Sequence, residues 1–154
     1  MDKKKKPLIF IDTNIFLIDL RYTNDINYNE NRKLLDYTLI NGGFTSIINL
    51  LEVCGILSYN LNRQQLKELF YYFPKKYNLE IVPTSELRLA LPKIYIHDIM
   101  ETIYQKSSFG DAMVINAIKP HITPNSVFLT WDDKHFKDIS PVRVVNPTEF
   151  LKNY

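Results

Sequence analysis

The sequence predicts an α/β domain in which a central parallel sheet is flanked by helices. Short apolar runs alternate along the chain with longer segments of helical periodicity, and turn signals separate them. No internal repeat or linker marks a second domain. The chain has 154 residues, 45% hydrophobic and 23% charged, which is enough to bury one core without cross-links. We therefore expect a basic tail at residues 1–6 and one domain at residues 7–154.

The first strand is expected at residues 8–11, a short apolar run that contains two isoleucines. The polar residues that follow offer capping groups for a helix over residues 15–20. Asp12 therefore falls at the carboxyl end of a strand. Residues 21–29 are polar and rich in asparagine, and they predict a loop.

A second helix is indicated by one apolar face and by the glycine pair at residues 42–43, where it should end. The residues of that face are Leu34, Leu35, Thr38 and Leu39. A strand at residues 44–46 leads into a helix over residues 47–59, which is apolar around most of its circumference and must be buried on several sides. The next helix, over residues 63–73, is expected to stop at Pro74.

The second half of the chain continues the alternation of strands and helices. A strand is predicted at residues 79–82, followed by helical segments at residues 84–91 and 94–105 that Pro92 separates. A helix over residues 110–118 comes next. The remaining elements are two short strands and a brief terminal helix, expected at residues 127–129, 142–145 and 147–150.

Composition narrows the cellular setting. The single cysteine, Cys54, cannot form an internal disulfide and lies in an apolar run, which favours core packing in a reducing cytoplasm. No apolar stretch is long enough to span a bilayer, and the lysines of residues 3–6 precede only a short apolar run, so neither a membrane segment nor a signal peptide is expected. A net charge of +2 does not by itself argue for nucleic acid.

Isolated acidic residues interrupt three of the apolar segments. Each is the only charged residue in its segment: Asp12 in residues 7–18, Glu52 in residues 37–62 and Asp111 in residues 107–118. An ionised carboxylate removed from water is costly unless it is paired, hydrogen-bonded or bound to metal. None of the three segments contains a lysine or arginine that could serve as a local partner.

Each acid also has an ordinary interpretation when it is considered alone. Asp12 and Asp111 could cap helices, Asp132 and Asp133 could form a turn, and Glu52 could be exposed on a seam. These interpretations weaken when they are taken together, because the strand-end loops of a parallel sheet converge at one edge. Four acids at that edge would repel one another without a cation.

The available ligand types indicate which cation would fit. Oxygen donors without cysteine or histidine suit Mg²⁺ or Mn²⁺, whereas a zinc site usually includes imidazole or thiolate. His97 and His121 are interpreted as surface or packing residues. His135 lies three residues after Asp132 and could contact a substrate.

The segments around these acids form four motifs in a fixed order. They are an apolar-Asp-Thr-Asn opening at residues 10–14, a strand and turn leading to a helix with a lone Glu at residues 45–52, a Gly-Asp-Ala helix start at residues 110–115, and an acidic turn at residues 129–136. This series resembles the PIN-domain nucleases, including the VapC-like toxins of prokaryotic toxin–antitoxin pairs.

The resemblance implies a PIN-like, Rossmann-like three-layer sandwich, in agreement with the alternation of elements. It also implies that Asp12, Glu52 and Asp111 are catalytic ligands of Mg²⁺ or Mn²⁺ and that Asp132 is the fourth acid. Many family members carry asparagine at that position or another acid soon after it, so Asp133 also stays open for the fourth role. The polar residues expected to support the site are Thr13, Asn14, Ser46, Thr130 and Asp133.

The activity implied by the resemblance is hydrolysis of RNA by metal-activated water, which leaves 5′-phosphate and 3′-hydroxyl ends. A toxin of this kind would also have a protein antitoxin as its partner. Two alternatives within the fold are a DNA-cleaving nuclease and a PIN-like module that binds RNA or protein without cutting. A phosphotransfer domain with an aspartate nucleophile fits poorly, because Asn14 stands where such phosphatases usually carry a second aspartate.

The sequence also predicts self-association. The helix at residues 47–59 is apolar on nearly all sides, and residues 70–73 form an aromatic run. Exposed apolar patches of more than a few hundred Å² usually mark interfaces, so we expect a homodimer. The competing interpretation is that both segments belong to the core.

Overall fold

The computed structural model of the protein describes residues 5–154 and contains a five-stranded parallel sheet. The strand order is β3-β2-β1-β4-β5, and every neighbouring pair is parallel. The strands are β1 (Leu8–Ile11), β2 (Gly43–Ser46), β3 (Leu79–Val82), β4 (Ser126–Leu129) and β5 (Arg143–Val145). The predicted fold class is confirmed. Residues 1–4 of the predicted basic tail lie outside the described residues.

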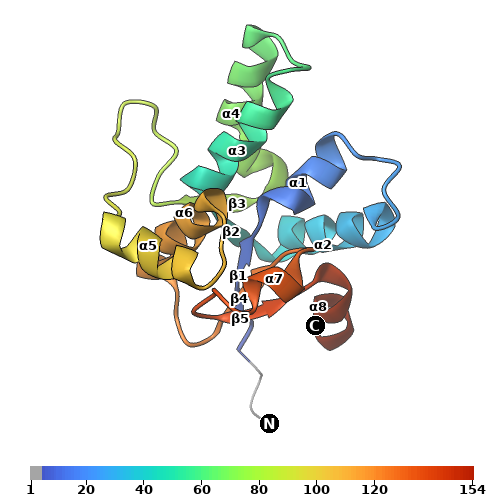
Figure 1. The fold of residues 1–154 in the computed structure, drawn as a ribbon. Coiled ribbons are helices and arrows are strands. Elements are labelled where there is room, and N and C mark those ends of the chain that lie inside the picture. Colours follow the sequence, from blue (N-terminus) through green and yellow to red (C-terminus); the bar gives the residue numbers. More distant parts are fainter. Residues whose placement is uncertain (1–4) are drawn as a thin grey trace.

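Helices lie on both sides of the sheet, with α5 and α6 on one side and α1, α2 and α8 on the other (Figure 1). The helices are α1 (Thr13–Leu20), α2 (Tyr28–Asn41), α3 (Ile47–Leu57), α4 (Arg63–Tyr77), α5 (Ile96–Tyr104), α6 (Phe109–Ile118), the 3-10 helix η1 (Lys119–His121), α7 (Asp133–Phe136) and α8 (Pro147–Asn153). The pair α3 and α4 projects beyond the end of the sheet (Figure 1). Among the helices of residues 5–154, none is both long and apolar enough to cross a membrane.

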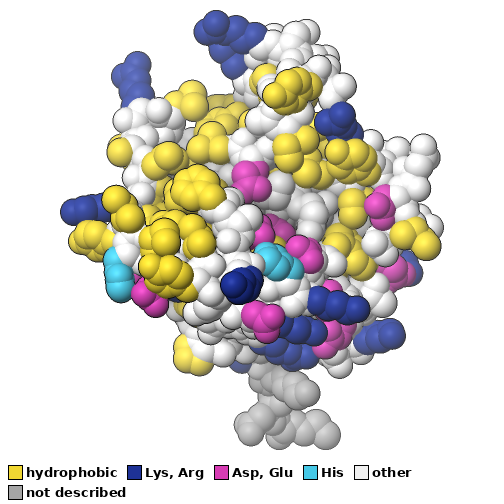
Figure 2. Space-filling model, viewed as in Figure 1, with side chains coloured by type: hydrophobic (Ala, Val, Ile, Leu, Met, Phe, Trp, Pro, Cys, Tyr) yellow, Lys and Arg dark blue, Asp and Glu magenta, His cyan; other side chains and the backbone are white. Residues whose placement is uncertain are grey.

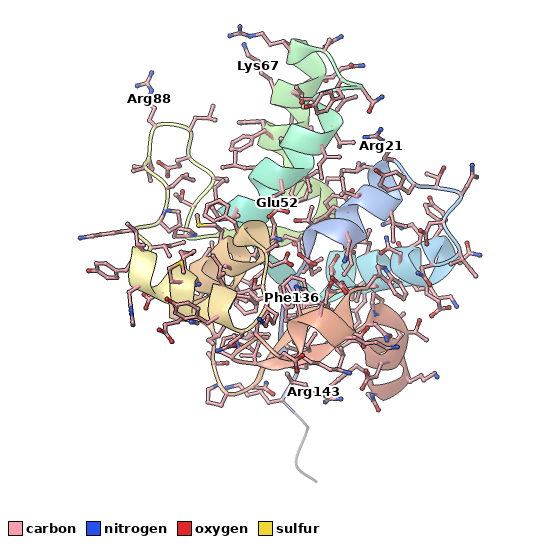
Figure 3. The ribbon with its side chains drawn as sticks, viewed as in Figure 1. Arg21, Glu52, Lys67, Arg88, Phe136 and Arg143 are labelled. Atoms are coloured by element: carbon pink, nitrogen blue, oxygen red, sulfur yellow. The ribbon has the colours of Figure 1, made fainter. Side chains whose placement is uncertain are left out.

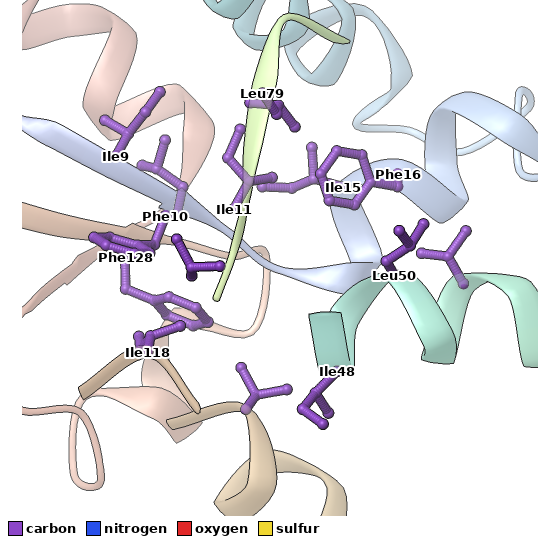
Figure 4. Close-up of a cluster of buried hydrophobic side chains, with 14 of the residues drawn as sticks. Ile9, Phe10, Ile11, Ile15, Phe16, Ile48, Leu50, Leu79, Ile118 and Phe128 are labelled. Atoms are coloured by element: carbon purple, nitrogen blue, oxygen red, sulfur yellow. The ribbon is translucent and has the colours of Figure 1, made fainter. Parts of the chain in front are cut away.

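The central strand β1 is buried on both faces, which explains its unbroken apolar sequence. Ile9, Phe10 and Ile11 are almost fully buried. Figure 4 shows them in a cluster with Phe128 of β4 and Ile118 of α6. Helices on both faces therefore enclose a strand whose carboxyl end is available to carry a polar group.

The register of the sheet places the ends of three strands beside one another. Ile11 pairs with Leu129, so Asp12 and Thr130 are the first residues after two neighbouring strands. The backbone N–H of Asp12 continues this pairing by donating to the Leu129 carbonyl at 3.0 Å. On the other side of β1, β2 ends at Ser46, which begins α3.

One predicted helix is wrong, because residues 84–91 form an irregular segment. The Thr84 hydroxyl accepts a hydrogen bond from the Glu86 N–H at 3.1 Å, which is a local turn that competes with a helix. Leu87, Leu89 and Leu91 are exposed, the first of them by 84%. Their spacing of two residues does not form a helical stripe, so no face of a helix here could be buried.

Pro74 does not end α4 as predicted but lies inside it, because the helix continues to Tyr77. Phe73 and Tyr77 are both buried, and their rings pack on Phe16 with centroids 4.7 and 5.2 Å away. This packing holds the last turn in place. Leu39 of α2 also departs from the prediction, since it is exposed while the rest of its face is buried.

A partly buried charge network joins α1, α2 and α4. Arg32 Nη1 lies 2.6 Å from Asp19 Oδ1, and the Tyr77 hydroxyl donates to Asp19 Oδ2 at 2.8 Å. Burial, together with the charge of Asp19, raises the pKa of Tyr77 above its usual range, so the phenol keeps the proton that it donates. The network fixes α1, which begins at Asp12, against its neighbours.

Replacing Tyr77 with phenylalanine should destabilise the protein, because one oxygen of the buried Asp19 carboxylate loses its donor. Hydrogen bonds to charged groups contribute about 1.5–3 kcal/mol, and we expect a loss of that size in urea unfolding. The control is Tyr71→Phe. Because Tyr71 is 76% exposed, loss of its hydroxyl should change stability by less than about 0.5 kcal/mol. Equal effects of the two substitutions would contradict the role of the network.

Candidate active site

Asp12 lies at the centre of the candidate site, at the end of β1 and the start of α1. Its side chain is only 6% exposed. Oδ1 accepts from the Thr13 backbone N–H at 2.8 Å and from Asn49 Nδ2 at 3.2 Å, and Oδ2 accepts from Thr130 Oγ1 at 2.8 Å. Within residues 5–154, no lysine, arginine or histidine forms an ion pair with it.

The electrostatic environment of Asp12 opposes its ionisation. Burial raises the pKa of Asp12 to about 7, even though the donors from Thr130 and Thr13 favour the ionised form. The negative charges of Glu52 and Asp111 raise the pKa further. A nearby cation would reverse this balance, because it would stabilise the carboxylate that burial and the other acids destabilise.

Glu52 reaches the site from α3 and lies near the centre of the view in Figure 3, between α1, α3 and α6. Thr13 Oγ1 lies within hydrogen-bonding distance of Oε2 at 3.2 Å. In the described part of the chain, Oε1 is buried and has no hydrogen-bond partner. It faces the first turn of α6, where a Cβ on Gly110 would lie 3.9 Å away. Burial raises the pKa of Glu52, and the charge of Asp111 adds to the shift.

Asp111 comes from the first turn of α6 but does not cap that helix. Ser108 is the cap, and its hydroxyl accepts from the Asp111 backbone N–H at 3.2 Å. The carboxylate is free to contact another element, and its Oδ2 lies 3.1 Å from His135 Nε2. His135 therefore lies beside the acidic side chains, whereas His97 and His121 have no ion pair with any residue of the described chain.

The two adjacent aspartates after β4 differ in their surroundings. Asp132 is exposed, and its backbone N–H donates to Thr130 Oγ1 at 3.0 Å. Asp133 begins α7 and its carboxylate lies 3.5 Å from Lys137 Nζ. Within residues 5–154, Asp133 therefore forms an ion pair and Asp132 forms none.

Two of the predicted supporting residues, Thr13 and Thr130, form hydrogen bonds directly to the acids. Asn14 Nδ2 donates to Thr130 Oγ1 at 2.9 Å, and Asn14 Oδ1 accepts from the Trp131 N–H at 3.3 Å. Trp131 Nε1 donates in turn to Asn31 of α2 at 2.8 Å. Ser46 caps α3 by accepting from the Asn49 N–H. The hydrogen bonds of Asn14 and Trp131 hold the turn after β4 against α1 and α2.

Asn49 is a site residue that the sequence did not reveal. It lies in the first turn of α3, is 1% exposed, and donates to both Asp12 and Thr13. The available signal was Ser46-x-x-Asn49, which has the spacing of a capping box before an apolar helix. An asparagine on an otherwise apolar helical face also needs a buried partner.

The donor set of these residues fits a hard divalent cation. Asp12, Glu52 and Asp111 offer carboxylate oxygens, and the buried Oε1 of Glu52 is an acceptor without a donor in the described structure. Figure 2 shows acidic side chains and a histidine gathered near the middle of this face. As placed in residues 5–154, no three carboxylate, imidazole or thiolate side chains form a ready-made cation cage. Binding would therefore draw the carboxylates closer together.

Comparison with known proteins agrees with the fold. The family model of the PIN domain matches residues 9–140. No curated protein matches the chain.

Solved structures with similar folds cover nearly the whole chain. FitAcB from Neisseria gonorrhoeae is 18% identical, with 92% of this chain and 99% of that chain covered and a TM-score of 0.60. VapBC2 from Rickettsia felis, bound to a DNA fragment from their promoter, is 20% identical, with 90% and 98% covered and a TM-score of 0.59. VapBC-1 from nontypeable Haemophilus influenzae is 14% identical, with 92% and 98% covered and a TM-score of 0.58. At these identities the likeness establishes a shared fold.

The raised pKa of Asp12 predicts how stability depends on pH in the absence of cations. Unfolding restores the ordinary pKa of 3.8, so the unfolded chain releases a proton that the folded protein retains up to about pH 7. In EDTA, the stability contributed by this group should therefore fall as the pH rises from about 4 through 7. Asp12→Asn has a similar shape and does not ionise, so its melting temperature relative to the wild type should rise by several degrees between pH 5 and pH 8. A difference that does not change with pH would contradict the shift.

Proposed function

The chain belongs to the PIN domain family, and on that basis we propose that it is a Mg²⁺- or Mn²⁺-dependent endoribonuclease that hydrolyses phosphodiester bonds in RNA. Members of this family are typically nucleases. The observation that carries the proposal is the buried Asp12 carboxylate, which has two further acids near it and no ion-pair partner within residues 5–154. A bound cation would stabilise the ionised carboxylate in this arrangement at neutral pH.

Asp12, Glu52, Asp111 and Asp132 are the proposed ligands and catalytic acids. These residues would hold a divalent cation, which would supply an activated water and neutralise charge on the attacking and leaving oxygens of the phosphodiester. The protein's own part is to donate hydrogen bonds that orient the acids and favour their ionised forms against the effect of burial. Thr130 does this for Asp12 through the hydrogen bond to Oδ2.

The remaining site residues have supporting parts in this proposal. Thr13 of α1 contacts Glu52, Ser46 caps the helix that carries Glu52, and Asn14 of α1 donates to Thr130. The Asp133 carboxylate pairs with Lys137, and this pairing favours Asp132 as the fourth acid. His135 can steady Asp111 until a cation and substrate arrive.

The cellular role that we propose is that of a toxin in a toxin–antitoxin pair, held in check by a protein antitoxin in the cytoplasm. The motif series resembles VapC-like toxins, and solved structures with the same fold are VapBC and FitAB assemblies. A small open reading frame just upstream of this protein's gene would support such a partner if it encodes a DNA-binding antitoxin. DNA cleavage is the alternative activity, and it is distinguished by the substrate that is cut.

Purified protein should cut RNA internally when Mg²⁺ or Mn²⁺ is present, stop in EDTA and resume with excess metal. Asp12→Ala, Glu52→Ala and Asp111→Ala should each remove most of the activity, and combinations should not add, because the acids act as a unit. Total cellular RNA is the substrate of choice, since a narrow preference would hide activity on a generic oligonucleotide. Duplex and single-stranded DNA tested in parallel separate the two nuclease activities.

The matched control is Glu101→Ala, which removes an exposed acid of α5 and should leave cleavage unchanged. Asp132→Ala should lower cleavage more than Asp133→Ala, because Lys137 already pairs with Asp133. Cleavage by the triple variant of Asp12, Glu52 and Asp111 at the wild-type rate would refute the proposal. So would full wild-type activity in EDTA.

The protein is also proposed to form a homodimer. Most of α3 is buried, which the core interpretation explains, but Leu51 on α3 and Tyr71 and Tyr72 on α4 are exposed. They line one side of a cavity of about 1470 Å³, and Leu87 lines it from the irregular segment after β3. A hydrophobic surface of this kind is better covered than left in water.

Light scattering at micromolar concentration should give the mass of a dimer. Tyr71→Ser combined with Leu51→Ser should shift the mass to that of a monomer without a large change in melting temperature, since both side chains are exposed. Tyr59→Ser changes an exposed aromatic residue that does not line the cavity, and it should leave the dimer intact. A monomer mass for the wild type would rule out dimerisation.

A further inference from the structure

Asn49 connects two of the acids through hydrogen bonds of its side chain. Nδ2 lies 3.2 Å from Asp12 Oδ1 and 3.0 Å from Thr13 Oγ1. Thr13 Oγ1 in turn lies 3.2 Å from Glu52 Oε2. Asn49 therefore contacts one acid directly and reaches the other through a single hydroxyl group.

The direction of each hydrogen bond in this connection is fixed by chemistry. The Oδ1 atom of Asn49 accepts from Ser46 Oγ at 2.7 Å and from the Ser46 N–H at 3.3 Å, so the amide nitrogen must face the site. An amide nitrogen only donates, and an ionised carboxylate only accepts. The Thr13 hydroxyl must then accept from Asn49 and donate to Glu52.

Asp12 and Glu52 come from different elements, and the buried connection sets how they face each other. Asp12 follows β1, whereas Glu52 lies on α3, three residues after Asn49. Asn49 is 1% exposed, and Ser46, which orients its amide, is fully buried. Water therefore cannot readily substitute for the amide donor, and rotation of the amide would place two acceptors face to face.

We propose that Asn49 is a positioning residue, whose amide donor holds the Asp12 and Glu52 carboxylates in the relative orientation that binds a divalent cation. This inference rests on the proposed metal dependence. Asn49 acts through other side chains and is not itself a ligand. Hydrogen-bond partners of metal ligands typically contribute about 10- to 100-fold to metal affinity, which sets the size of the expected effect.

A competing interpretation is that Asn49 serves only the capping box of α3, in which its side chain and that of Ser46 bond to each other's backbone N–H. Gln65→Leu offers the matched control, because Gln65 holds the same capping-box position in α4, a helix that carries none of the proposed ligands. Asn49→Leu removes the amide at nearly the same volume. A pure capping role predicts the same changes for both variants.

The test is direct measurement of Mn²⁺ binding to the full chain by the electron paramagnetic resonance signal of free Mn²⁺, below the melting temperature of every variant. Asn49→Leu should weaken binding about 10- to 100-fold, and Gln65→Leu should change it by less than about threefold. Asn49→Ala serves the same comparison if the leucine variant does not fold. Melting curves in EDTA measure what each change does to the fold alone.

Each outcome of the binding measurement decides the proposal. Weak binding by the Asn49 variants together with normal binding by Gln65→Leu supports positioning. Equal affinities for the wild type and the Asn49 variants, or equal losses for the Asn49 variants and Gln65→Leu, overturn it while metal dependence stands. If the wild type binds no Mn²⁺, the proposed function fails, and positioning fails with it.

Discussion

The Asp12 carboxylate lies almost out of water at the end of a strand that is covered on both faces. Burial works against its charge, and Glu52 and Asp111 add to the opposition. Three donors from Thr13, Asn49 and Thr130 hold its oxygens without neutralising them. The surrounding structure can be understood as what is needed to keep this group in place, because such an arrangement is unfavourable unless a cation compensates it.

The parallel sheet supplies this arrangement without long connections. Strands β1, β2 and β4 are neighbours and run in the same direction, so their carboxyl ends deliver Asp12, Ser46 and Thr130 to one edge. Helix α3 starts there and carries Glu52, and α6 brings Asp111 in its first turn. Ligand sites of open parallel sheets occur at this edge for the same reason.

The sequence predicts those parts of the structure whose signal is local. The apolar run of β1 and the acid after it could be recognised because a buried strand and an isolated charge are both visible in a short window. The helix predicted at residues 84–91 is wrong, because the leucines there do not form one helical face that could be buried. A short window of sequence does not reveal Asn49, because the side chains to which it donates hydrogen bonds are 36 and 37 residues away in the chain. The surroundings of Asp132 and Asp133 likewise depended on Lys137 and on the short helix α7.

The ends of the cleaved RNA report which atom attacks the phosphorus. They therefore test directly whether the acidic site activates water. Water activated at the acidic site would attack from outside the RNA chain, so we predict 5′-phosphate and 3′-hydroxyl ends in the presence of Mn²⁺. Attack by the neighbouring ribose hydroxyl would need no metal ligands and would leave 2′,3′-cyclic phosphate. Mapping the end groups after wild-type cleavage decides between them, and cyclic phosphate would contradict a function built on Asp12, Glu52 and Asp111.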